Sequence, residues 1–370
     1  YPGPVGVDIK CSMSLLQLDL PAEAIADRKT RRAIIDAILE RTPTGPGRGN
    51  RSVPKGRHVT SAQGREAITR GASAKICQEL GIPSHWASVC EDSTHAGHDG
   101  TYDALDARLD VIMESFGQSR FFEKMSQLGT YGGGNHFGEC EVVNVGADAT
   151  AQKTAEVFGL RDKHVAFLSH CGSRGFGAIL AENQFRTMRQ HFEVNEIDLP
   201  GNDRYMVHAE LGTNLANDYI CDMSMGANFA TVNHLLINSL ILEAFQEVLP
   251  GTKGDLVYFI SHNIARLEQT RHGPAWVHRK GATRAFPGGH PALANTKFAE
   301  VGHPILLPGN PAAGSAVMVG EAGAAASQFS VNHGAGRVMG RKKAIRTLDQ
   351  SSIDQDLAAR DILTTCRQYP

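Results

Sequence analysis

The sequence predicts an α+β fold: one mixed domain, residues 1–370, in which β-sheets are surrounded by helices. Three observations predict this class. Apolar residues recur at helical spacing in two long stretches, and short runs rich in β-forming residues lie among the helices without strict alternation. No shift in composition marks a linker between two cores, so we expect a single domain.

The two helices are predicted from apolar residues at every third or fourth position. The first series consists of Leu105, Leu109, Ile112, Met113 and Phe116. The second series consists of Phe229, Val232, Leu236, Leu240 and Phe245. A Pro-Gly pair at residues 250–251 follows the second series and is typical of a helix end. Both patterns predict amphipathic helices.

The strands are predicted from short runs of β-forming residues, which are Leu15–Leu20, Cys140–Val145, His164–Ser169, Leu256–Ser261 and Ser315–Val319. The stretch Thr42–Arg57 is rich in proline, glycine and arginine instead, and we predict a mobile loop there. Its basic residues are Arg48, Arg51, Lys55 and Arg57.

The composition limits the functions that the chain can serve. A formal net charge of −2 lacks the global basicity of many nucleic-acid-binding proteins, so any such contact must be a local patch. Seven cysteines, an odd number without CxxC spacing, argue against a disulfide framework or zinc ribbon and favour a reducing, cytoplasmic location. The longest apolar stretches, such as residues 235–242, fall short of the roughly 20 residues of a membrane span. We therefore expect no transmembrane helix and no membrane contact.

Histidines beside predicted strand ends are the first chemical signal. His136, His170 and His262 each lie next to such an end, and strand ends meet at shared edges where functional side chains gather. Asp8 and Cys11 add a carboxylate and a thiolate near the start of the chain. Five side chains of these types suffice for a two-metal site with open coordination positions. We therefore expect a central metal-binding cleft.

Each of these residues also has a plainer interpretation. A lone histidine is more often a hydrogen-bonded structural residue than a ligand, and a lone cysteine is more often a small buried apolar residue. All three histidines, however, have polar or glycine neighbours in irregular backbone. That context favours an open pocket over a core.

Glycine-rich loops are the second signal. They lie at residues 132–134, 172–175 and 333–337, and the last two include arginine. Glycine exposes backbone amides that bind anions, and arginine supplies positive charge. Many such loops are ordinary turns, and no GxxxxGK[ST] phosphate-binding loop occurs.

The order and wording of seven separated segments closely resemble the RtcB family of RNA-splicing ligases. The segments are PVGVDIKC (residues 4–11), LGTYGGGNHF (128–137), HCGSRG (170–175), SHN (261–263), HRKGATRA (278–285), PG (308–309) and HGAGR (333–337). The match extends from the first residues to about Lys343. The resemblance implies that residues 1–370 form an RtcB-like catalytic domain.

The resemblance implies two Mn²⁺ ions per chain. Cys11 would bridge them, Asp8 and His136 would bind one ion, and His170 and His262 would bind the other. Ligand chemistry alone does not select manganese, because a thiolate favours zinc whereas a carboxylate permits manganese.

The resemblance also implies a GTP-dependent reaction in which His333 is the nucleophile. His333 would attack the α-phosphorus of GTP and carry GMP in a covalent histidine–GMP intermediate. The guanylate would then activate an RNA 3′-phosphate for attack by a 5′-hydroxyl end, and a 2′,3′-cyclic phosphate would first be opened by hydrolysis. The expected role is RNA splicing or RNA repair.

The remaining expected contacts belong to the nucleotide. The resemblance and the anion-binding chemistry of the loops place Asn135, Arg174, Ser315, His333, Gly334, Gly336 and Arg337 around it. The basic residues Arg279, Lys280 and Arg284 either contact phosphate or form a solvated basic face. We expect a monomer, and an archease-like activator is a candidate partner.

Two departures and two alternatives stand beside this interpretation. Lys10 and Ser12 occupy positions where the family commonly has glycine, and residues 310–316 depart from the usual family run. One alternative is a two-metal phosphoesterase or nuclease that forms no nucleotide adduct. The other is a non-catalytic component of an RNA repair complex that binds RNA ends.

Overall fold

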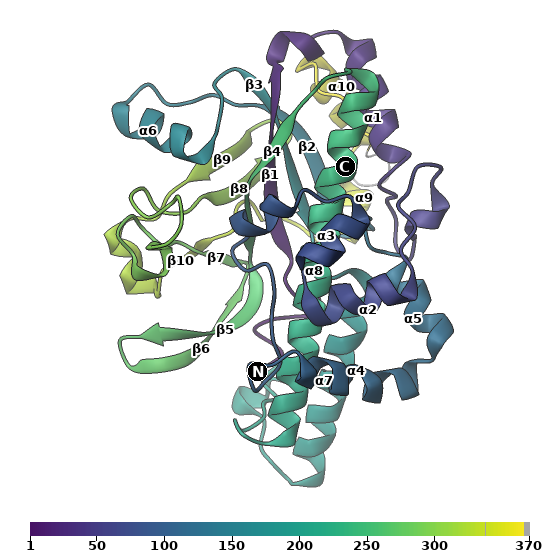
Figure 1. Ribbon diagram of the computed structural model, residues 1–370, viewed down its shortest axis with the longest axis vertical. Helices are drawn as coiled ribbons and strands as arrows, with labels where there is room; N and C mark the ends of the chain where they lie inside the picture. The colour runs from purple at the N-terminus through teal and green to yellow at the C-terminus, as the bar shows by residue number, and fades with distance from the viewer. Residues whose placement is uncertain (337, 366–370) are drawn as a thin grey trace.

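The structure is a computed structural model that describes residues 1–336 and 338–365. At its centre lies a four-stranded antiparallel sheet with the strand order β2-β3-β1-β4 (Figure 1). Its strands are β1 (Ser12–Pro21), β2 (Phe137–Val142), β3 (His164–Cys171) and β4 (Gly254–Ser261). Three smaller two-stranded sheets pair β5 with β6, β7 with β10 and β8 with β9. Their strands are β5 (Asn263–Thr270), β6 (Gly273–Lys280), β7 (Ala282–Arg284), β8 (Ile305–Asn310), β9 (Gly314–Met318) and β10 (Ser330–Asn332).

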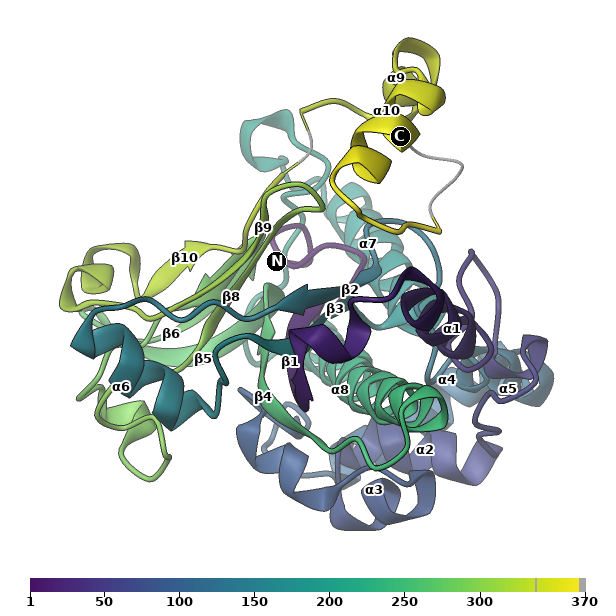
Figure 2. The same ribbon diagram turned by 90° about the horizontal axis from the view of Figure 1, so that it is seen from above.

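Most helices gather on one side of the central sheet, and the smaller sheets lie on the other (Figures 1 and 2). The α-helices are α1 (Arg28–Leu39), α2 (Ser61–Arg70), α3 (Ala74–Leu80), α4 (Asp103–Phe116), α5 (Gln118–Met125), α6 (Ala149–Phe158), α7 (Arg174–Val194), α8 (Asn214–Val248), α9 (Arg341–Thr347) and α10 (Gln350–Ala359). Short 3-10 helices lie at Ala22–Ile25, Asn50–Ser52, Ser84–Val89, Pro200–Asn202, Pro291–Leu293 and Ala322–Ser327. Helix α8 packs against β1 and β3 and is itself surrounded by α1, α2, α4 and α7.

Strand β1 is buried on both faces, because it separates two apolar clusters. Leu16 and Leu18 face the cluster that contains the helices, whereas Met13 and Leu15 face the cluster under the smaller sheets. Although Ser14, Gln17 and Asp19 interrupt the run, the period-2 alternation of a strand therefore places apolar residues on both sides. This is why the sequence shows β1 clearly.

The register of the central sheet brings four strand ends to one edge. Ser12 pairs with both Cys171 and Ser261, and Phe137 pairs with His170. The beginnings of β1 and β2 therefore lie beside the ends of β3 and β4.

The α+β prediction is confirmed, and so are both predicted helices, in α4 and α8. The strand predicted at Cys140–Val145 is displaced, because β2 begins at Phe137 and ends at Val142. The amphipathic character predicted for the second helix is wrong, because every residue of α8 from Cys221 to Ile241 is buried. Helix α8 begins at Asn214, well before the predicted apolar series, because the side chain of Thr213 caps its first turn. In the described part of the chain, no helix combines the length and apolar character needed to cross a membrane.

Candidate metal centre and nucleophile

The shared edge of the central sheet carries the predicted ligands. Cys11 directly precedes β1, and His136 directly precedes β2. His262 directly follows β4, whereas His170 is the penultimate residue of β3 and does not follow its strand as the sequence suggested. Asp8 lies in the turn before Cys11, whose N–H donates to the Asp8 carbonyl at 3.1 Å. The fold thus brings all five residues together.

The first group of donor atoms belongs to Asp8, Cys11 and His136, and these atoms lie within 4.8 Å of one another. Nε2 of His136 lies 2.8 Å from Oδ2 of Asp8 and 3.8 Å from Sγ of Cys11. The other ring nitrogen of His136, Nδ1, donates to the carbonyl of Tyr131 at 2.9 Å. A metal-binding histidine usually has such a carbonyl partner, which fixes the ring so that Nε2 faces the ion.

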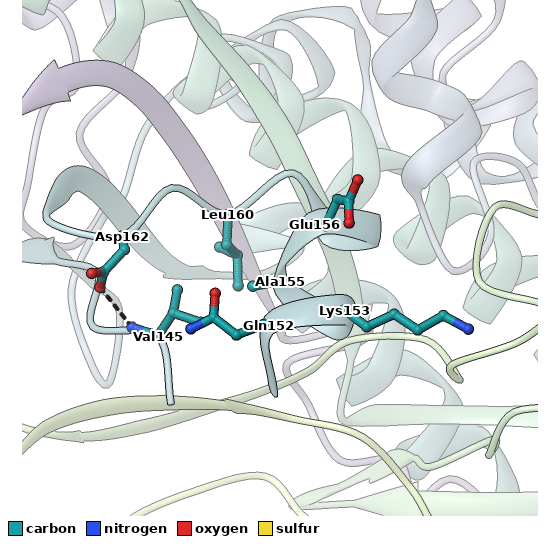
Figure 3. Close-up of a pocket in the computed structure, with 7 residues that line it drawn as sticks. All are labelled: Val145, Gln152, Lys153, Ala155, Glu156, Leu160 and Asp162. Atoms are coloured by element: carbon teal, nitrogen blue, oxygen red, sulfur yellow. Dashed lines mark hydrogen bonds between the residues drawn. The ribbon is translucent and has the colours of Figure 1, made fainter. Parts of the chain in front are cut away.

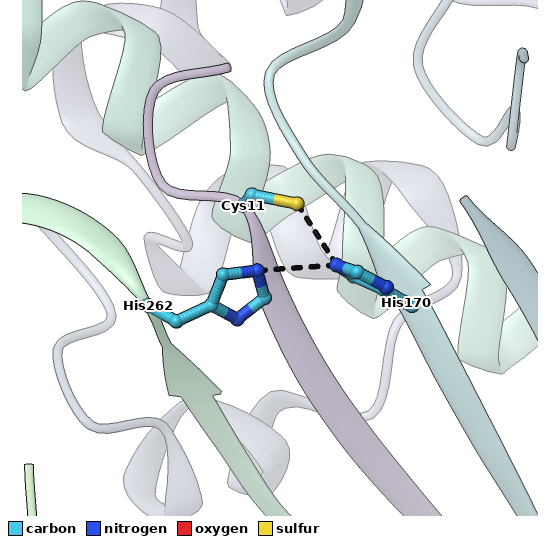
Figure 4. A group of neighbouring side chains, drawn as sticks. All are labelled: Cys11, His170 and His262. Atoms are coloured by element: carbon cyan, nitrogen blue, oxygen red, sulfur yellow. Dashed lines mark hydrogen bonds between the residues drawn. The ribbon is translucent and has the colours of Figure 1, made fainter. Parts of the chain in front are cut away.

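The second group belongs to Cys11, His170 and His262, and Cys11 is therefore common to both (Figure 4). Nε2 of His170 lies 3.0 Å from Sγ of Cys11 and 3.1 Å from Nε2 of His262. All three side chains are buried. Figure 4 shows the thiol and the two rings converging from three different strand ends.

The donor atoms suit a divalent cation. Because Nδ1 of His136 donates to a carbonyl, Nε2 faces the Asp8 carboxylate, and it can either carry a proton toward that carboxylate or offer its lone pair to an ion. Nε2 of His170 and Nε2 of His262 share at most one proton between them. A cation in each group would bind all the donor atoms of that group at once. The ligands of the two groups would be imidazole, carboxylate and thiolate.

The electrostatics of the edge favour neutral imidazoles at His170 and His262 but a charged ring at His136. Burial opposes the charge of His136, but the neighbouring Cys171 and the hydrogen bond to Asp8 outweigh burial and raise the pKa of His136 well above its ordinary value. Burial, together with the charge of His136, lowers the pKa of His170 to about 3. Burial and the neighbouring His170 also lower the pKa of His262 well below its ordinary value. Burial and the negative charge of Asp8 raise the pKa of the Cys11 thiol, so a thiolate here needs a nearby cation.

The candidate nucleophile His333 lies against the second group. Its ring centroid is 4.5 Å from that of His262. Nδ1 of His333 donates to the carbonyl of Gly281 at 2.9 Å, which leaves the lone pair of the neutral ring on Nε2. Burial lowers the pKa of His333.

A short network joins the loop of His333 to the metal loop. Asn263 Nδ2 donates to the Asp8 carbonyl at 3.3 Å, and the N–H of Gly281 donates to Asn263 Oδ1 at 3.1 Å. Gly281 in turn holds His333. The network therefore couples the position of His333 to that of the loop that carries Asp8.

The predicted nucleotide loops border the same edge. Arg174 is buried, donates through Nε to Thr130 Oγ1 at 3.0 Å, and fills the space where a Cβ on Gly132 would stand. Gly334 has φ +124°, and a Cβ there would lie 2.5 Å from the carbonyl oxygen of Pro308, so only glycine fits. Asn135 and Gly336 are exposed, and Arg337 lies outside the described residues.

Ser315 does not lie beside the metal ligands. Its Oγ donates to Oε1 of Glu141 at 3.0 Å, and Glu141 lies five residues along β2 from His136, roughly 16 Å for an extended strand. Burial and the charge of Glu141 raise the pKa of the adjacent Glu139 to about 7. The strand predicted at Cys140–Val145 leaves out Glu139, so the sequence did not indicate this carboxylate pair.

The interpretation of Arg279, Lys280 and Arg284 as a solvated basic face is wrong for the two arginines. Arg279 is buried and forms a two-pronged ion pair with Glu268, at 2.7 and 2.9 Å. Arg284 donates to the same carboxylate at 2.8 Å. Lys280 is exposed, and its Nζ donates to the carbonyl of Gly3 at 2.9 Å. The two arginines therefore stabilise the smaller sheets.

Lys10 is the residue whose importance the sequence did not show. It is fully buried, and its backbone lies in the left-handed region that favours glycine, with φ +52°. Its Nζ lies 2.7 Å from the Asp92 carbonyl, 2.6 Å from Thr231 Oγ1 and 2.9 Å from His95 Nε2. These partners fix the loop between Asp8 and Cys11 to the interior.

The Lys10→Met variant is expected to lower the free energy of unfolding by about 2–4 kcal/mol, because one buried and two half-buried acceptors would lose their donor. Urea denaturation measures this change. Lys29→Met, which alters an exposed lysine on α1, serves as the control and should change stability by less than about 0.5 kcal/mol. A Lys10→Met variant as stable as the control would show that the three contacts contribute nothing.

A separate cavity of about 450 Å³ lies beside α6 (Figure 3). Gln152, Glu156 and Leu160 are among its lining residues, and the N–H of Val145 donates to Asp162 there at 2.8 Å. None of the predicted metal or nucleotide residues lines this cavity. It therefore does not belong to the candidate site.

The fold and its edge define an α+β protein with two candidate metal-binding groups and a histidine fixed beside one of them. The sequence profile described as tRNA-splicing ligase RtcB matches residues 1–370. A tRNA-splicing ligase RtcB from Pyrobaculum aerophilum is 33% identical over 374 residues, which cover 98% of this chain and 72% of the relative. The corresponding proteins of Aeropyrum pernix and Thermococcus kodakarensis are each 31% identical and likewise cover 98% of this chain and 71% of the relative. The chain belongs to the RtcB family.

Proposed function

We propose that the chain is an RNA ligase that joins an RNA 3′-phosphate or 2′,3′-cyclic phosphate end to a 5′-hydroxyl end. It uses GTP and passes through a GMP adduct on His333. Membership of a family whose relatives are named tRNA-splicing ligases supports the RNA ligase activity. The observation that carries the finer proposal is the ring of His333, which is fixed through Nδ1 while it lies against His262.

Two Mn²⁺ ions are the proposed metals. Asp8 and His136 would hold one ion, His170 and His262 the other, and Cys11 both, in line with the two groups of donor atoms. When bound, the ions supply positive charge that neutralises the triphosphate and the departing pyrophosphate. The carbonyl of Tyr131 fixes the ring of His136 for this task.

The proposed reaction has three steps, and residues of this chain position the reactants in each. Nε2 of His333 attacks the α-phosphorus of GTP, the bond from that phosphorus to the β-phosphate oxygen breaks, and pyrophosphate leaves. An oxygen of the RNA 3′-phosphate then attacks the same phosphorus and releases His333. Finally the 5′-hydroxyl loses its proton and attacks the activated RNA phosphate, and GMP leaves.

The nucleotide is proposed to lie along the glycine-rich loops that border His333. Arg174, Gly334 and Gly336 offer guanidinium and amide donors beside the edge, and we retain Asn135, Ser315 and Arg337 as proposed contacts. The cytoplasmic location, the monomeric state and an archease-like activator stay predictions.

A ligation assay tests the proposal. RNA with a 3′-phosphate and RNA with a 5′-hydroxyl are incubated with each of the four nucleoside triphosphates and with Mn²⁺, Mg²⁺ or Zn²⁺. Joining that requires GTP and is strongest with Mn²⁺ is expected. Release of phosphate or cleavage of RNA without any need for GTP would contradict the proposal and indicate a two-metal phosphoesterase.

A further inference from the structure

The basic residues of the loop Thr42–Arg57 fall into two classes in the structure. Lys55 Nζ lies 2.6 Å from Glu247 and 3.0 Å from Glu40, and Arg57 pairs with Glu243. Arg48 and Arg51 are exposed and form no ion pair with any residue that the structure describes. Two of the four charges therefore stabilise the fold, and two are available to a partner.

The backbone of this loop is fixed against the segment that precedes His136. The N–H of Gly45 donates to the carbonyl of Gly132 at 2.7 Å, and Tyr131 N–H donates to the carbonyl of Pro43 at 3.2 Å. Tyr131 is also the residue whose carbonyl holds the ring of His136. The loop therefore borders the first group of metal ligands.

Arg48 is fixed next to that edge through its backbone. Arg174, beside the metal ligands, has Nη2 at 3.5 Å from the carbonyl oxygen of Arg48. Three residues along the same loop, the guanidinium of Arg51 lies 4.2 Å from the centre of the ring of Phe122, a stacking contact that holds it in place. We call Arg48, Arg51 and Phe122 the arginine rim.

We propose that the arginine rim binds the sugar–phosphate backbone of an RNA strand whose end lies in the metal centre. This inference rests on the proposed function. Guanidinium groups bind phosphate through paired hydrogen bonds, and arginine and aromatic planes stack on unpaired bases. Because the chain as a whole carries a charge of −2, an RNA contact has to be a local patch, and the rim is such a patch beside the ligands.

The experiment compares the Arg48→Ala/Arg51→Ala variant with an Arg186→Ala/Arg271→Ala control. The control removes the same charge from exposed arginines on α7 and on the turn between β5 and β6. Binding of a fluorescent single-stranded RNA of about 20 nucleotides with a 3′-phosphate is measured by anisotropy at several salt concentrations. GMP adduct formation is measured in parallel without RNA.

The rim variant should bind RNA about 10-fold more weakly than the control. The slope of log Kd against the logarithm of the salt concentration should be about 1.4 smaller for the rim variant than for the control. This is the value for two lost phosphate contacts on a single strand. Adduct formation should be unchanged in both variants. An Arg48→Lys/Arg51→Lys variant should keep the salt dependence of the wild type, because it keeps the charges.

Equal RNA affinity and equal salt dependence in the rim variant and the control would overturn the proposal. So would a rim variant that binds RNA normally but loses binding to an acidic protein, since the rim would then serve a protein partner. Failure of the wild-type protein to form an adduct would count against the proposed function alone, because RNA binding is measured directly.

Discussion

The Cys11→Ala variant is expected to lose most of its bound metal and to reduce ligation by roughly 100-fold or more. Sγ of Cys11 is the one donor atom common to both groups, so its removal leaves each group with two ligands. The thiol is small, and the fold should survive with a cost of about 1 kcal/mol for the lost atom. Metal content by mass spectrometry, together with circular dichroism, measures both effects.

Cys171→Ala is the matched control for this prediction. Cys171 is also buried beside the edge, but its Sγ accepts from Asn233 Nδ2 at 3.2 Å and belongs to neither group of donor atoms. It should therefore keep its metal. A Cys11→Ala variant that retains full metal and full ligation would show that the bridging role is wrong.

The His333→Ala variant should abolish the GMP adduct while it keeps both metals. His333 is absent from both groups of donor atoms, and it touches them only through the ring of His262. Ligation of ordinary 3′-phosphate RNA should fall below detection. RNA whose 3′-phosphate is already guanylylated should still be joined, at least in part, because the last step needs only positioning and charge neutralisation.

His262→Ala provides the comparison, since it removes a proposed ligand and should damage every step together. Ligation of the guanylylated RNA is measured for the two variants side by side, with metal content for each. Equal loss in both would indicate that His333 is a metal ligand or a structural residue and not the nucleophile.

The sequence could predict the ligands that lie beside the ends of strands. Cys11 directly precedes β1 and His262 directly follows β4, and the sequence shows both strands as runs of β-forming residues. The strand order could not be predicted, because pairing β1 between β3 and β4 joins residues more than 140 positions apart. That order is what places Cys11 between the histidines. Only the resemblance implied that its thiol belongs to both groups.

Side-chain partners were the least predictable feature. Arg279 and Arg284 appear as a basic run in the sequence, and only the fold brings Glu268 against both. Lys10 likewise finds acceptors on distant loops and on α8, so its burial has no local signal. Ser315 faces Glu141 because β9 lies near β2, a long-range contact that no spacing in the sequence indicates.

The most direct test of the central claim is incubation of the protein with Mn²⁺ and GTP labelled at the α-phosphate, followed by acid or alkali and peptide mapping. The account predicts a covalent label that acid removes and alkali does not, on the peptide that contains His333, since a phosphoramidate is acid-sensitive. An acid-stable label, a label on lysine, or no label while the protein releases phosphate from RNA 3′ ends would contradict it.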